Sequence, residues 1–158
     1  YTIILSFLFS FSVFADYEAG LDAYKKGDYA TALKIYRAAA GQGNTLAQYK
    51  IGQIYRSPNK FRKLVTQNHR EAFIWFYKAA GQGEVMAQYM LGQIYRYGNG
   101  IKKKNLVIAH MWFNIAASNG FENASENRKL ISERMTASDI SKAQQLAREC
   151  VKKEYKGC

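Results

Sequence analysis

Two stretches of this chain repeat almost the same phrase. Residues 39–56 read AAGQGNTLAQYKIGQIYR and residues 79–96 read AAGQGEVMAQYMLGQIYR, with 13 of 18 positions identical at a spacing of 40 residues. Self-similarity at such a period is typical of repeat proteins, in which each unit buries its apolar face only against its neighbours. The repeat therefore predicts a stack of like units.

A shorter segment of the phrase occurs three times. The copies are ALKIYRAAAGQG at 32–43, AFIWFYKAAGQG at 72–83 and AHMWFNIAASNG at 109–120, so successive copies begin 40 and 37 residues apart. The difference of three residues corresponds to an insertion in the loop at 57–68, which carries the only proline. Loops accept such changes in length at a small entropic cost. The three copies therefore represent one unit.

Each copy begins with the apolar spacing of a helix. In the second copy, one helical face would carry Ala72, Trp75, Phe76, Ala79 and Ala80. Gly81 or Gly83 is expected to end this helix, because glycine adopts the left-handed conformation without a Cβ clash.

A second helix is expected over 87–96. Gly92 lies inside it and recurs as Gly52, which indicates close packing against a neighbouring helix, since glycine otherwise destabilises a helix interior by about 1 kcal/mol. The predicted fold is all-α: an α-solenoid of antiparallel helix pairs, with about three repeats.

Capping helices are expected at both ends of the stack. Residues 17–29 suggest a short N-terminal cap, and residues 135–150 supply a closing helix with a polar outer side. Thr136 and Asp139 have the spacing of a capping box at the start of that closing helix.

The first fifteen residues, YTIILSFLFSFSVFA, carry no charge. They are too few to span a bilayer as a helix, which needs about 20 apolar residues, and they end with small residues at Val13 and Ala15, as a signal peptidase requires. We therefore expect a signal peptide at 1–15, truncated at its own N-terminus, with an uncleaved membrane anchor as the alternative. The expected divisions are a repeat domain at 16–135 and a closing segment at 136–158, in a protein that is periplasmic or secreted.

Both cysteines, Cys150 and Cys158, lie at the C-terminal end. An even count in an exported protein predicts a disulfide. On one continuous helix their Cα atoms would lie ~12 Å apart, beyond the ~7 Å that a disulfide tolerates. The helix should therefore stop soon after Cys150, and Gly157 should help the tail to fold back.

The repeat resembles a known family at specific residues. Its pattern A-x2-W-x3-AA-x2-G-x3-A-x3-LG-x2-Y-x2-G-x-G looks like the Sel1-like repeat, a relative of the tetratricopeptide repeat. The second copy matches it at Ala72, Trp75, Ala79, Ala80, Gly83, Ala87, Leu91, Gly92, Tyr95, Gly98 and Gly100.

The other two copies depart from this pattern. The first has Ile35 where Trp would stand, and the third lacks the LG-x2-Y signature in its second helix. The ending MTASDISKAQQLAREC resembles the C-terminal helix of exported bacterial members. The resemblance implies a solenoid and leaves the function open.

Catalysis is not visible in the sequence. Some cysteine-rich exported relatives carry a β-lactamase label, yet residues 16–158 contain no S-x-x-K, S-D-N or K-T-G triplet. His69 lies in a basic loop and His110 beside an apolar helical face, with no spacing that suggests a metal pair. We expect no catalytic residues, no metal and no cofactor. A β-lactamase-like or cell-wall-binding envelope protein remains the alternative to a binding scaffold.

The charge points to anionic partners. The chain carries 23 Lys and Arg against 12 Asp and Glu, a net charge of +11, which favours nucleic acid, anionic lipid, acidic polysaccharide or acidic protein. Export argues against nucleic acid. We expect a protein or peptide partner, acidic in character, with association with an anionic envelope surface as a further option.

The first helices offer a candidate groove. Some of their positions point away from the apolar stripe, and apolar residues there would face water unless a partner or a neighbouring helix covers them. The candidate groove residues are Lys34, Arg37, Arg70, Ile74, Tyr77, Met111 and Asn114. Burial of these positions by a neighbouring helix is the equal alternative.

Cations recur in the loops that join the units. Equivalent loops of a solenoid lie along one edge, so these cations are expected to form a basic ridge that could steer an acidic partner. The ridge residues are Lys60, Arg62, Lys63, Lys102, Lys103 and Lys104. Solubility alone would also account for them.

Overall fold

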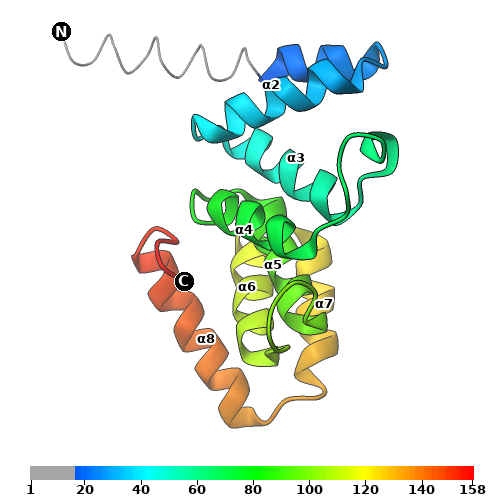
Figure 1. Cartoon of the computed structure of the whole chain (residues 1–158). Helices are drawn as coiled ribbons and strands as arrows, with labels where there is room; N and C mark the ends of the chain where they lie inside the picture. The colour runs from blue at the N-terminus through cyan, green and yellow to red at the C-terminus, as the bar shows by residue number, and fades with distance from the viewer. Residues whose placement is uncertain (1–16) are drawn as a thin grey trace, which may run out of the picture.

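The computed structural model describes residues 17–158; the expected signal peptide at 1–15 lies outside this range. After helical residues 17–25, the elements are α2 (Tyr29–Gly41), α3 (Thr45–Arg56), the 3-10 helix η1 (Asn59–Phe61), α4 (His69–Ala80), α5 (Val85–Tyr97), α6 (Leu106–Ser118), α7 (Glu122–Ser132) and α8 (Ala137–Lys152). No strand occurs between residues 17 and 158. The helices pack in sequence as antiparallel pairs (Figure 1), which confirms the predicted α-solenoid. None of these helices is long and apolar enough to cross a membrane.

The first helices of the three copies start in the same way. Their N-cap side chains are Asp28, Asn68 and Asn105, and each accepts a hydrogen bond from the backbone N–H three residues later, at 3.0, 3.0 and 3.1 Å. These bonds satisfy one of the free donors at each helix N-terminus. At the predicted capping box, Thr136 Oγ1 accepts from Asp139 N at 3.1 Å and donates to the Asp139 carboxylate at 2.9 Å, so the N-cap bond is present and the reciprocal bond goes to the Thr136 hydroxyl in place of its backbone N–H.

Glycines in the second helices receive aromatic rings from the next first helix. A Cβ on Gly52 would lie 2.7 Å from the ring of Phe76, and a Cβ on Gly92 would lie 2.4 Å from the ring of Phe113. Contacts this short do not occur in folded proteins, so only glycine permits the approach. Close packing, the reason expected for these glycines, is therefore confirmed.

The same contact occurs before the first copy. Gly20 stands against the ring of Tyr36, with 2.7 Å from its hypothetical Cβ. The helical residues 17–25 therefore pack as a second helix of a unit, in addition to covering the N-terminal end of the stack.

The two tryptophans contribute unequally to the core. Trp112 is 1% exposed and lies in the central cluster. Trp75 is partly buried against the first-copy cluster, with the Lys78 ammonium 4.3 Å from its ring centroid. Neither indole points into open solvent.

A glutamine in α3 and another in α5 each join two units through their side-chain amides. Gln48 donates to the carbonyl of Ala40 at 3.1 Å and accepts from Gln82 at 2.8 Å. Forty residues on, Gln88 donates to Ala80 at 3.5 Å and accepts from Asn119 at 2.9 Å. These buried amides fix the register of adjacent units, because an unpaired buried amide would be costly.

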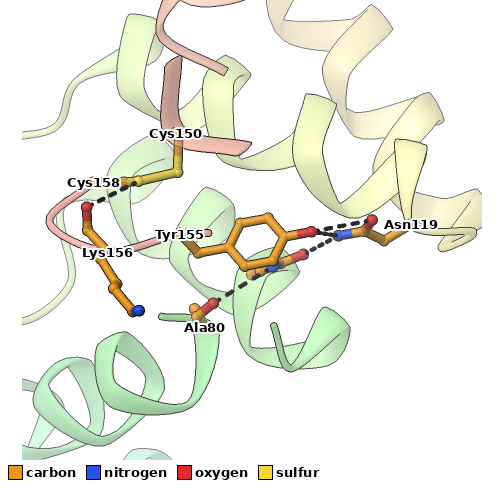
Figure 2. The surroundings of a disulfide bond; sticks show 7 residues. Ala80, Asn119, Cys150, Tyr155, Lys156 and Cys158 are labelled. Carbon is orange, nitrogen blue, oxygen red and sulfur yellow. Dashed lines mark hydrogen bonds between the residues drawn. A yellow bond between two sulfur atoms is a disulfide. The ribbon is translucent and has the colours of Figure 1, made fainter. Parts of the chain in front are cut away.

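The closing helix α8 packs along α6, and the tail folds back from its end (Figure 1). A disulfide joins Cys150 to Cys158, whose Cα atoms lie 5.6 Å apart, as the two cysteines predicted. Gly157 has the positive φ of 70° that the reversal requires. Figure 2 shows the Tyr155 side chain pointing towards Asn119, whose amide donates to the Tyr155 hydroxyl at 3.2 Å. The tail thereby joins the chain of side-chain amides between the units.

Candidate binding surfaces

The candidate groove is open on α2. Lys34 and Arg37 are both exposed, and Arg37 donates a long hydrogen bond of 3.4 Å to the Tyr55 hydroxyl. No acidic residue occurs in α2. This part of the first-helix face therefore carries unpaired positive charge.

The groove residues on α4 mix charge with apolar surface. Arg70 is exposed, Ile74 is partly buried, and Tyr77 is 36% exposed. The Phe73 ring packs against the Tyr77 ring, with centroids 5.9 Å apart, and also contacts the Tyr95 ring edge-on at 6.0 Å. Tyr77 thus presents an aromatic side chain that is held in place and open to solvent.

The groove does not continue onto α6. Met111 is only 2% exposed because α8 covers it, and it packs in one cluster with Ala147 and Cys150. Asn114 is partly buried and accepts a hydrogen bond from Arg128 of α7. The alternative raised from the sequence, burial by a neighbouring helix, therefore describes Met111, and the open face is confined to α2 and α4.

The two histidines have different surroundings. His69 is exposed at the start of α4, whereas His110 is 2% exposed and its Nδ1 has no hydrogen-bond partner. Burial lowers the pKa of His110, and the nearby Arg128 guanidinium adds a smaller effect in the same direction. His110 is a neutral packed residue, placed beneath the surface. Between residues 17 and 158, no three His, Cys, Asp or Glu side chains gather as metal ligands would.

The cations of the expected ridge all lie on exposed loops. Lys60, Arg62 and Lys63 follow α3, and Lys102, Lys103 and Lys104 follow α5. The two loops adjoin at the start of α4, where a Cβ on Gly100 would lie 2.3 Å from the His69 carbonyl oxygen. The two ion pairs of the described residues, Lys26–Asp22 and Lys156–Glu154, involve none of these six. Whether the six cations act as one surface stays a prediction.

The fold and these surfaces define a class of protein: an α-solenoid of stacked helix pairs with charged and aromatic side chains on its exposed faces. Three Sel1 repeats match residues 15–44, 45–84 and 85–121, which together make up more than half of the chain. The chain belongs to the Sel1 repeat family. It is a Sel1-repeat scaffold, an architecture typical of protein–protein interaction.

The solved structures similar to the chain include two named proteins. One is c5321, a protective antigen of uropathogenic Escherichia coli strains with an SLR fold, at 28% identity and a TM-score of 0.80; the match covers 90% of this chain and 30% of that chain. The present chain thus spans under a third of that antigen's length. The other is a Sel1 repeat protein from Oxalobacter formigenes, at 32% identity and a TM-score of 0.66, covering 74% of this chain and 87% of that one. No curated protein matches the chain.

The repeat boundaries give the predicted N-terminal cap helix a second role. The first matched repeat begins at residue 15, so the helical residues 17–25 belong to a repeat. The signal was present in the sequence: Ala15, Tyr17 and Gly20 have the spacing of the A-x-Y-x-x-G element that starts the second helix in later copies. The element was concealed because Asp22 stands where the later copies have Ile54 and Ile94.

Proposed function

We propose that this protein is a non-enzymatic adaptor that binds a protein partner along the first-helix face of α2 and α4. The observation that carries the proposal is Tyr77, an exposed ring held by Phe73 and placed beside partly buried Ile74. Exposed aromatic side chains of this kind are enriched in protein interfaces.

The charges around Tyr77 suggest the chemistry of the partner. Arg70 lies one turn before Ile74 on α4, and Lys34 and Arg37 occupy the equivalent face of α2, while Glu71 is the one acidic residue of α2 and α4. Complementary charge accelerates association and orients the partner. The expected partner is a protein segment that carries acidic side chains next to an apolar one.

We also propose that the protein works outside the cytosol, in the periplasm or beyond. The Cys150–Cys158 disulfide supports this, because such bonds persist in oxidising compartments, and the apolar residues 1–15 have the features of a signal peptide. Expression of the full chain in a bacterium, followed by fractionation and N-terminal sequencing of the product, tests the location. An intact N-terminus in the cytosolic fraction would refute it.

The binding face can be tested with two matched pairs of alanine variants. The first is Ile74→Ala with Tyr77→Ala, on the proposed face. The second is Leu130→Ala with Tyr97→Ala, which removes similar exposed apolar surface from α7 and α5. The oxidised protein is used to isolate partners from an envelope extract of its host, and the affinity of the principal partner is then measured for each variant.

We expect the first pair to weaken binding by about tenfold or more, as loss of an interface hot spot does, and the second to leave it unchanged. Equal binding by both pairs would contradict the assignment of the face. Incubation with a chromogenic β-lactam tests the enzymatic alternative, and we expect no turnover and no covalent adduct.

A further inference from the structure

A pocket of about 210 Å³ lies between the helical residues 17–25, α3 and the loop that follows α3. Its polar lining consists of Lys50, Gln53, Arg56, Ser57, Asn59 and Lys60, and it includes no carboxylate. On the same measure, one water molecule needs about a tenth of this volume or less. The pocket therefore has room for a small ligand that would meet three cationic side chains.

Two of these cations converge on one aromatic ring. The ammonium of Lys50, from α3, lies 5.1 Å from the centroid of Tyr24, and the ammonium of Lys60, from η1, lies 5.5 Å from the same centroid. The face of a tyrosine attracts each cation. It does not remove the repulsion between them, and that repulsion is relieved by an anion placed in the pocket.

Lys50 has no counter-ion among residues 17–158. It is partly buried, and this burial lowers the pKa of its ammonium group. The two ion pairs within residues 17–158, Lys26–Asp22 and Lys156–Glu154, lie elsewhere. A desolvated cation without a partner is unfavourable, so the empty pocket holds a charge that a bound anion would stabilise.

The loop that carries Lys60 is anchored. Its neighbour Phe61 is buried, stacked on Tyr24 at 5.9 Å and edge-on to Tyr29 at 5.6 Å. Further along, Gln67 donates to the carbonyl of Arg56 at 2.7 Å and ties the two ends of the loop together. The backbone that carries Lys60 is thus ordered before any ligand arrives, which reduces the entropic cost of binding.

The next unit supplies an internal comparison. Its equivalent pocket, of about 460 Å³, keeps Gln93, Ile94 and Asn99 at the positions of Gln53, Ile54 and Asn59. Forty residues after Lys50 and Lys60, however, the chain has Met90 and Gly100. The solenoid therefore forms this pocket without the two lysines, and their presence in the first unit is not required by the fold.

We propose that the pocket of the first unit binds a phosphoryl group through Lys50, Arg56 and Lys60. Three cations suit a dianion better than a single carboxylate, and the Gln53 and Asn59 amides can donate to further oxygens of a tetrahedral anion. The group can come from a free phosphate or from a phospholipid headgroup. The site lies on α3 and its loop, away from the first-helix face, and is independent of the adaptor proposal.

The test is a titration of the whole chain with inorganic phosphate at low salt, followed by calorimetry and amide chemical shifts. We expect saturable binding by the unsubstituted chain. Lys50→Met combined with Lys60→Gln should weaken it about tenfold or more, because hydrogen bonds to charged groups are lost. Lys102→Gln combined with Lys103→Gln removes the same charge from the equivalent loop and should change the affinity by about twofold or less, since exposed charges are screened.

Folding is controlled within the same design. Lys50→Met copies Met90 of the next unit, so the melting temperature of that single variant should be equal to or higher than that of the unsubstituted chain. A second arm of the experiment adds vesicles of phosphatidylglycerol. If free phosphate competes with vesicle binding, the lipid headgroup is a source of the phosphoryl group. If free phosphate does not compete, free phosphate is the ligand. The proposal is overturned by an absence of saturable phosphate binding, or by equal losses in the two double variants.

Discussion

The same position of the first helix has a different role at the two ends of the solenoid. Lys34, Ile74 and Met111 are equivalent residues of the three copies, 40 and 37 residues apart. Lys34 is exposed, Ile74 is partly buried and Met111 is 2% exposed, so the side chain becomes more apolar as the cover increases. The cover is α8, which packs along α6. A repeat position is therefore surface or core according to what packs on it next.

The largest expected effect on stability comes from substituting lysine, the residue of the first copy, for Ile74 and for Met111. Met111→Lys would bury an ammonium beneath α8 without a partner, and we expect a loss of about 3–5 kcal/mol in the free energy of unfolding. Ile74→Lys keeps its charge at the open face, so we expect a change of about 1 kcal/mol or less. Urea denaturation followed by circular dichroism measures both. Similar losses in the two variants would show that α4 is covered as α6 is.

Reduction of the disulfide should affect only the covered end. Closing a loop of this size stabilises by about 2–3 kcal/mol in the chain-entropy model, and reduction should release the tail that holds Tyr155 against Asn119. Thermal melts with and without reductant measure the loss, and limited trypsin digestion should then cleave at Lys153 and Lys156. Cys150→Ala combined with Cys158→Ala is the control, which should melt at one temperature in both buffers.

The close contact between a helix glycine and an aromatic ring of the next helix occurs at both ends of the solenoid, and substitution of the glycine tests it. Gly92→Ala would force a methyl group into the buried Phe113 ring, so we expect a loss of about 1–3 kcal/mol from overpacking. Gly41→Ala is the matched control, because a Cβ there meets nothing within 4 Å, and it should be neutral or slightly stabilising. Equal unfolding midpoints for the two variants would mean that neighbouring units can move apart to accept the methyl group without a loss of stability.

The smallest effect concerns pH. Because the pKa of His110 is lowered in the folded state, the unfolded chain binds more protons once the pH falls below the ordinary histidine value of about 6.5. Stability should therefore decrease as the pH falls from neutrality, by at most about 1.4 kcal/mol per pH unit from this group. His110→Gln should reduce that slope, and exposed His69→Gln is the matched control for loss of an imidazole. Denaturation curves at several pH values compare them, and identical slopes would count against the buried neutral state.

Much of the fold was predictable because the repeat consists of local sequence patterns. The apolar spacing identified the helices, the recurring Gly52 and Gly92 indicated close approach, and the two cysteines with Gly157 indicated the folded-back tail. These features depend on residues near one another in the chain, or on a period that the chain displays twice.

The binding surfaces were less predictable. The period relates Met111 to Ile74 and cannot show that α8 turns back over α6. Nor does any spacing indicate that Lys50 and Lys60 meet at Tyr24, because the three residues come from different elements of adjacent units.

The amino-acid sequence by itself determined the helix pairs, their stacking contacts and the closing disulfide, since helix periodicity, glycine size and cysteine spacing act locally or between like units. The tertiary structure decided which side chains remain available to a partner. Exposure depends on what covers a residue, and at the C-terminal end the covering element, α8, lies outside the matched repeats.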